Sequence, residues 1–333
     1  MSNPYYETGA CSSLSDFMDK MMTFAASASI DVGHRFTVET VTTPQTLNTA
    51  GAPSGGTTYS FTVKCLSRGG YYWWWRYNTT GGLYTMVAPN GGASSWNSVT
   101  GKPTNDCEVF PLPGGGVYHF VSIDDVINAV CVLSNGVHVH LNFGKLTKVG
   151  NWVGGEFTTG SRHNSSGGWN GTPISGYHRF MFQVGNTGRG TQGDGIMHCE
   201  YNSKNFAAMD YYYVNARSGY NLVKHVGGLP SGIGDWTGSA RVCIDPDFSP
   251  NSFTPYRSSG FDLSYQLLRD ADDSLFYDLG FVPGVRFVNM QLINPGDPLN
   301  TDWLVFPLSL KGLVGSSGNY ASSADYGVAY YKG

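Results

Sequence analysis

The first clear periodicity in the chain is helical. Apolar residues recur at spacings of three and four near the N-terminus, which places them on one side of a helix. These residues are Leu14, Phe17, Met18, Met21 and Ala25. Ser13, followed three residues later by Asp16, resembles the box that caps a helix N-terminus. The pattern predicts a helix over residues 14–28, packed through its apolar side on a sheet, because a short helix needs such support.

Beyond this segment the period changes to two. Apolar and polar residues alternate over residues 60–65, 137–143 and 180–184, which is typical of half-buried strands. In the second of these, His138, His140 and Asn142 form the polar side. Residues 303–306 are continuously apolar and predict a strand buried on both faces.

Turn signals rich in Gly, Asn and Pro separate these strands. The pair Asn135 and Gly136, between residues 129–133 and 137–143, predicts a β-hairpin. The fold class that follows is mainly β. We expect antiparallel sheets in a sandwich-like arrangement, one packed N-terminal α-helix and long loops rich in Gly and Ser.

The organisation of the chain follows from a change in periodicity. Residues 150–176 have little period, and similar loop-like sequence recurs up to residue 238. Long loops of this kind are usually functional. We expect an N-terminal module (residues 1–149), a loop-rich excursion (150–238) and a C-terminal β module (239–333), or one composite domain. Trp152, Phe157 and Trp169 are predicted to hold the excursion in place.

Composition narrows the class of protein. The 333 residues include 45 Gly, charged residues make up only 13% and the net charge is −4. No basic run appears, so we expect no nucleic-acid partner. Low charge is typical of surfaces covered by neighbouring subunits, because the cores of interfaces are depleted in charge. It is equally typical of Gly-rich β proteins, and the sequence leaves both readings open.

The six cysteines are widely spaced, with no C-x-x-C pair. Because no signal peptide is apparent, we expect synthesis in the cytoplasm and reduced thiols. Cys65 falls on the apolar side of its strand and is predicted to fill the core. No run approaches the ~20 apolar residues that a membrane span needs.

Candidate chemistry is sparse. His138 and His140 share one side of a strand and would bind a metal if His119, His163 or a carboxylate supplied a third ligand; the alternative is chance placement on an exposed strand. Adjacent Asp124 and Asp125 point to opposite sides of a strand and make no acid–base pair.

Other catalytic and binding motifs are missing. Residues 270–273 lack the Gly and Glu of a calcium loop, and no phosphate loop or nucleophile motif appears. We therefore expect no catalytic, cofactor or metal site, and a protein that is not an enzyme.

Residues 71–77, Tyr-Tyr-Trp-Trp-Trp-Arg-Tyr, are the most unusual segment. Alternation places Trp73 and Trp75 on one face, and Tyr72, Trp74 and Arg76 on the other. One face fills the core, so we expect the other to lie against a neighbouring subunit or a sugar. A subunit is favoured because no groove of carboxylates and amides accompanies the run. The predicted interaction residues are Tyr72, Trp73, Trp74, Trp75, Arg76, Trp152 and Trp169.

A family resemblance rests on the order of several segments. Residues 13–25 have the form Ser-Leu-x-Asp-Phe, seven residues and Ala, and residues 118–126 the form Tyr-His-Phe-x-x-x-Asp-Asp-Val. Residues 137–157 then read VHVHLNFGKLTKVGNWVGGEF, and residues 281–290 read FVPGVRFVNM. Pro-Gly-Asp at 295–297 precedes Trp-Leu-Val-Phe-Pro at 303–307.

This succession resembles structural proteins of tailed-bacteriophage virions, of the tail or baseplate group. The resemblance covers most of the chain in order and is specific at residues 143–157 and 281–307. It implies assembly in several copies, with other virion proteins and copies of the chain itself as partners, and it implies no catalytic residue. The alternative is a receptor- or carbohydrate-binding tail protein that contacts a host surface glycan. A glycan-degrading tailspike is a third class, and it needs paired carboxylates in a groove.

Overall fold

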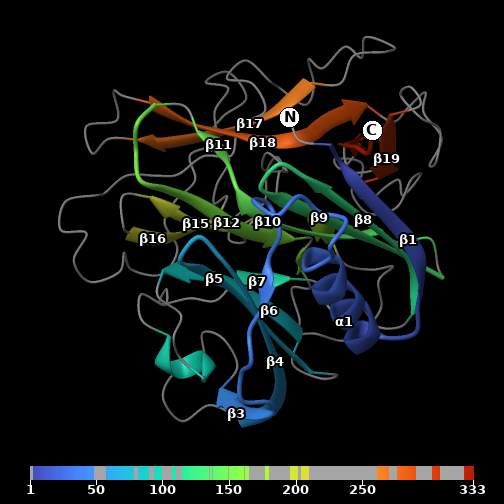
Figure 1. Ribbon diagram of the computed structural model, residues 1–333, viewed down its shortest axis with the longest axis vertical. Helices are drawn as coiled ribbons and strands as arrows, with labels where there is room; N and C mark the ends of the chain where they lie inside the picture. The colour runs from blue at the N-terminus through green and yellow to red at the C-terminus, as the bar shows by residue number, and fades with distance from the viewer. Residues whose placement is uncertain are drawn as a thin grey trace.

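A computed structural model describes residues 3–48, 58–78, 82–89, 94–99, 107–109, 115–134, 136, 138–148, 150–160, 162–164, 177–179, 196–201, 204–209, 261–269, 276–289, 302–307 and 326–333 (Figure 1). Three expectations fall outside these residues: the strand at 180–184, the acidic turn at 270–273, and the position of Trp169. The predicted mainly β class with one N-terminal α-helix is confirmed, because the described elements are antiparallel strands with one α-helix and one short 3-10 helix; the long loops rich in Gly and Ser stay a prediction.

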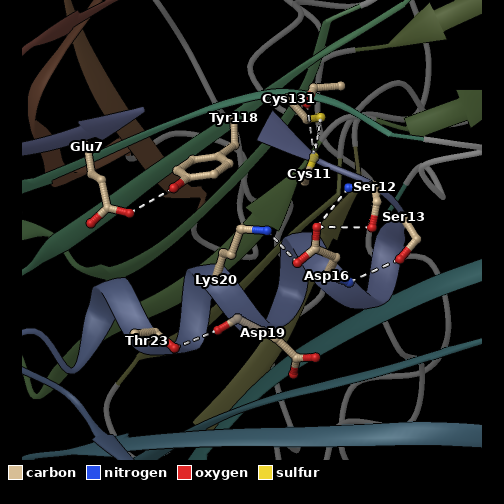
Figure 2. Close-up of polar contacts among 11 residues, drawn as sticks. Glu7, Cys11, Ser12, Ser13, Asp16, Asp19, Lys20, Thr23, Tyr118 and Cys131 are labelled. Atoms are coloured by element: carbon tan, nitrogen blue, oxygen red, sulfur yellow. Dashed lines mark hydrogen bonds and ion pairs between the residues drawn. The ribbon is translucent and has the colours of Figure 1, made fainter. Parts of the chain in front are cut away.

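Helix α1 spans Leu14–Ala25, and its predicted apolar side is buried. The Ser13 side chain caps it by accepting from the Asp16 N–H at 3.2 Å. Asp16 in turn accepts from the main-chain N–H of Ser12 at 2.7 Å, one residue before the cap (Figure 2). The helix ends three residues earlier than expected, because the Ala25 carbonyl accepts from the Phe36 N–H at 3.0 Å and the returning chain closes the helix there.

Seven strands form the central sheet, in which each strand pairs antiparallel with its neighbours. In spatial order they are β1 (Tyr5–Cys11), β8 (Gly116–Ile123), β9 (Val126–Leu133), β10 (His138–Lys145), β12 (Gly154–Gly160), β15 (Ile196–Tyr201) and β16 (Lys204–Met209). The predicted hairpin at Gly136 is confirmed as the connection of β9 to β10. Because β10 pairs with β12, the boundary expected at residue 149 does not separate two sheets.

Two further sheets complete the architecture. The aromatic sheet contains β2 (Thr37–Val38), β4 (Thr58–Arg68), β5 (Tyr71–Asn78), β6 (Gly82–Pro89) and β7 (Cys107–Val109), with β3 (Gln45–Asn48) paired to β4. The C-terminal sheet contains β11 (Thr147–Lys148), β18 (Phe276–Asn289), β20 (Tyr326–Tyr331) and β19 (Trp303–Pro307), with β17 (Phe261–Arg269) paired to β18. Strands β13 (Arg162–Asn164) and β14 (Tyr177–Arg179) pair with each other as a separate two-stranded sheet.

The central sheet lies between the other two (Figure 1). The first core joins α1, the central sheet and one face of the aromatic sheet, with Phe120, Phe143 and Trp75 among its members. A second core lies on the opposite face of the aromatic sheet, where Trp74 meets Trp96 of the 3-10 helix η1 (Trp96–Ser98). The three sheets therefore form layers. The second core covers one face of the aromatic sheet, and the C-terminal sheet covers one face of the central sheet; alternation alone would leave both of these faces exposed.

One strand differs from its expectation. Strand β19, the last strand of the described C-terminal sheet, was predicted to be buried on both faces, but its first two residues, Trp303 and Leu304, are only half-buried. Its last residues, Val305 and Phe306, are buried as expected.

Candidate functional site

The aromatic run of β5 is buried on both faces. Trp73, Trp74 and Trp75 each have an exposed fraction of 0%. Trp73 and Trp75 belong to the first core, whereas Trp74 belongs to the second core, against which Tyr72 also packs. The prediction that one face stays available to a partner is therefore wrong. The cause is that β5 pairs with β4 and β6 and lies in a sheet with packed layers on both sides.

Arg76 lies on the same face of this run as Trp74. Its guanidinium lies 4.7 Å from the centre of the Phe61 ring and 5.1 Å from that of Trp96. A cation over aromatic faces is stabilised by the negative charge of the ring faces. Arg76 is buried, so it contributes to the second core rather than to an outer surface.

Among the predicted interaction residues in the described chain, Trp152 and Tyr72 keep an exposed part, and Tyr72 packs against the second core. Trp152 precedes β12 and is half-buried. Lys148 donates from Nζ to the Trp152 carbonyl at 2.6 Å, and the same Nζ lies 5.2 Å from the centre of the indole ring. The next residue, Val153, is 57% exposed, and Phe281 on β18 is 40% exposed.

These residues lie at a corner where two distant segments meet. Thr147 pairs with Phe281 and Lys148 with Gly280, which joins β11 to β18. Two segments that are far apart in the sequence, residues 147–148 and 280–281, are thus brought together here. This corner, defined by Trp152, Val153 and Phe281, is a candidate interaction surface because apolar side chains remain exposed on it.

The second candidate is a polar layer between the central and C-terminal sheets, buried except at Tyr6 and His119, which are half-buried. It consists of Tyr6, His119, Asn128, His138, His140, Asn142 and Tyr330, with the carbonyl of Pro307. The sequence predicted an exposed polar side for β10. That prediction is wrong, because His138, His140 and Asn142 are all buried under the C-terminal sheet.

His140 is the centre of the polar layer. Its Nε2 lies 2.9 Å from the Pro307 carbonyl oxygen, which can only accept, so Nε2 carries the proton and donates. Its Nδ1, 2.8 Å from the hydroxyl of Tyr330, then accepts from that O–H. Burial, with added repulsion from His138, lowers the pKa of His140 to about 3, although the Pro307 carbonyl acts in the opposite direction. His140 is therefore neutral at physiological pH.

Asn142 extends the network around Tyr330. Its Nδ2 donates to Asn128 Oδ1 at 2.6 Å and lies 3.4 Å from the Tyr330 hydroxyl. Burial raises the pKa of Tyr330, which keeps the hydroxyl protonated and able to donate. Strands β9, β10 and β20 are thus connected through side chains that hydrogen-bond in the interior.

His119 forms a second link at the edge of the polar layer. Its Nδ1 lies 2.8 Å from the hydroxyl of Tyr6 on β1, and its ring centre lies 4.9 Å from that of Phe306 on β19. The Phe306 ring also faces His138, at 5.9 Å. Burial, with repulsion from His138, lowers the pKa of His119 to about 4.

The histidines of the polar layer have a structural role in connecting strands. Because both ring nitrogens of His140 are engaged in hydrogen bonds, the ring offers no lone pair to a metal while these bonds persist. In the part of the chain that the structure describes, no three His, Cys, Asp or Glu side chains are grouped to hold a metal ion.

The acidic pair at 124–125 forms the turn between β8 and β9. Asp124 has a φ of 46°, the left-handed conformation that short polar residues tolerate in tight turns. Asp125 lies 2.8 Å from His34 Nδ1 and 3.3 Å from an Arg68 amino nitrogen. Arg68 also donates to the main-chain carbonyls of His34 and Asp125, at 3.0 Å each. This cluster ties the hairpin to β4 and to the chain after α1.

Several members of the polar layer were not singled out from the sequence: Tyr6, Asn128, Asn142 and Tyr330. A signal was present for Asn128, which interrupts the apolar strand Val126–Leu133. A polar residue within such a strand indicates a buried hydrogen-bond partner. Tyr6 lies 113 residues from its partner His119 in the sequence, and Tyr330 lies 190 residues from its partner His140. A local sequence pattern cannot indicate such distant contacts.

Comparison of the sequence with protein-family models and with curated proteins finds no match. No helix among the described residues is long and apolar enough to cross a membrane.

Proposed function

We propose that this protein is a structural subunit of a tailed-bacteriophage virion, placed in the tail or baseplate, that acts through contacts with other virion proteins and with copies of itself. It is made in the host cytoplasm and incorporated into the particle. In this proposal the chain has no catalytic role. The layered β architecture supplies a rigid body for such contacts.

The observation that carries the proposal is the corner of β11 and β18. The two segments with the specific resemblance are far apart in sequence yet pair there, at Thr147 and Phe281. Exposed Val153 and Phe281, beside half-buried Trp152, supply an apolar surface of the kind found in the cores of subunit interfaces. A protein partner suits this surface because the exposed groups are apolar.

The polar side chains of the described chain support the same reading. His140, Asn142 and Asp125 are hydrogen-bonded or ion-paired within the fold. Their position favours a role in joining layers over a role in chemistry on a substrate.

The carbohydrate-binding alternative loses its main support. It relied on an exposed aromatic run, and Trp73, Trp74 and Trp75 are all buried in the cores of this chain. Stacking on a sugar requires an accessible ring face, and among the described candidates only the half-buried Trp152 and Tyr72 keep an exposed part.

A nonsense mutation in the phage gene tests the proposal. Electron micrographs of the resulting lysate should show tails or baseplates that are missing or incomplete, and expression of the protein in the host should restore them. Normal, infectious particles without the protein would contradict a structural role. Complete particles that fail to adsorb to the host would favour the receptor-binding alternative, and release of reducing ends from host polysaccharide by the purified protein would favour the tailspike class.

A further inference from the structure

The two faces of the central sheet are held by different chemistry. One face contributes Phe120, Leu141 and Phe143 to the apolar first core. The opposite face contributes His119 and His140, which lie on the same side of the sheet because His119 pairs with Val130 and Val130 pairs with His140. A face that depends on neutral histidines responds to acid, whereas an apolar face does not.

His119 and His140 both contact strands of the C-terminal sheet. His140 bonds Tyr330 of β20 and the Pro307 carbonyl of β19, and the His119 ring packs on Phe306 of β19. By contrast, the backbone pairing of β11 with β18 consists of two residue pairs. The polar layer therefore adds hydrogen-bonded contacts between the two sheets to apolar packing such as that of Ile123 against Gly284 of β18.

We propose that docking of the C-terminal sheet is acid-sensitive, so that β18, β19 and β20 separate from the central sheet at mildly acidic pH while the first and second cores stay intact. A proton added to His140 Nδ1 removes the acceptor for the Tyr330 O–H and places a charge in a fully buried site. This inference concerns the fold itself and does not depend on the proposed function.

The titratable groups around the two rings come from three strands. They are Tyr6 from β1, His138 from β10 and Tyr330 from β20, and Lys332 follows β20 with its Nζ 6.0 Å from the centre of the Tyr6 ring. Burial raises the pKa of both tyrosines, so neither becomes an anion that could balance a histidine cation in acid.

The direction of the pH effect follows from linkage. A histidine in the separated state has an ordinary pKa near ~6.5, whereas the docked values are about 4 for His119 and about 3 for His140. The separated state therefore binds more protons, and docking is weakened as pH falls below ~6.5 until the docked pKa is reached. Between pH 7.5 and pH 5, each ring raises the ratio of separated to docked protein by about thirtyfold, and the two together by several hundredfold, on the order of 10³.

Hydrogen–deuterium exchange followed by mass spectrometry tests this directly, with rates corrected for the intrinsic effect of pH. In the wild-type protein, peptides covering β18–β20 should lose protection by several hundredfold between pH 7.5 and pH 5, while peptides covering α1 and β4–β6 keep theirs. His119→Gln should make the loss about thirtyfold smaller than in the wild type, since the contribution of that ring is removed. His34→Gln, which changes a histidine outside the polar layer, should leave the wild-type ratio unchanged.

If it folds, His140→Gln provides a second test. Its loss of protection between pH 7.5 and pH 5 should be smaller than that of the wild type, as for His119→Gln. If it does not fold, His119→Gln and the wild-type profile still decide the question. Loss of protection in all layers at the same pH would overturn the proposal. So would a loss in β18–β20 that is identical in wild type and His119→Gln.

Discussion

Trp73 donates its indole N–H to the main-chain carbonyl of Phe157 at 2.8 Å, which ties the middle of the aromatic run to strand β12 of the central sheet. Both residues are fully buried. The bond joins segments 84 residues apart in sequence. The aromatic run thus connects two sheets through a specific polar contact in addition to its apolar area.

The first prediction separates the contribution of this hydrogen bond to stability from the contribution of the size of the ring. Trp73→Phe removes the donor and leaves the Phe157 carbonyl without it, whereas Trp74→Phe makes the same reduction in ring size at a residue whose Nε1 makes no hydrogen bond within the described chain. Trp73→Phe should lower the free energy of unfolding by about 1–3 kcal/mol more than Trp74→Phe. Urea unfolding monitored by circular dichroism measures both. Equal losses, or a larger loss for Trp74→Phe, would show that the bond adds no stability.

Alternation along β5 predicted correctly which residues share a face. It could not predict whether each face is covered, because that depends on segments distant in sequence. Trp74 is covered by Trp96 and Leu47, which belong to η1 and β3. The face that carries Arg76 is also interior, because the aromatic rings of Phe61 and Trp96 accommodate its cation.

The second prediction tests the docking of α1. Met21 is fully buried in the first core, so Met21→Asp places a carboxylate in an apolar contact. The free energy of unfolding should fall by about 3 kcal/mol or more. Thr23→Asp introduces the same side chain at an exposed position of the same helix, and its cost should stay below about 1 kcal/mol. Matching thermal melts for Met21→Asp and wild type would mean that α1 does not pack as described.

The third prediction concerns the thiols. Cys11 and Cys131 have sulfur atoms 3.6 Å apart, yet β8 lies between their strands (Figure 2). Strands two apart are separated by about 9–10 Å, whereas disulfides usually join Cα atoms less than ~7 Å apart. The pair should therefore stay reduced.

Titration of freshly purified protein with a thiol reagent, under denaturing and non-reducing conditions, should count all 6 cysteines. In the native protein Cys65 and Cys131 should react slowly, because burial raises the pKa of both thiols. A count of four or fewer would show that disulfides form and that the expectation from the cellular compartment fails.

The polar layer shows where local pattern stops being informative. The period of two in β10 placed His138, His140 and Asn142 on one side of a strand, and the structure confirms that shared face. The pattern could not show that the C-terminal sheet covers it, since the partner Tyr330 lies 190 residues from His140 in the chain. For the same reason, two histidines on one face suggested a metal site, although one ring is fully engaged by Tyr330 and Pro307.

The structural role is tested most directly by quantitative mass spectrometry of purified phage particles. The account predicts that the protein is present in several copies per particle, at a fixed ratio to the other tail or baseplate proteins, and that it remains after washing in high salt. A protein that is abundant in infected cells but absent from purified particles would contradict the account.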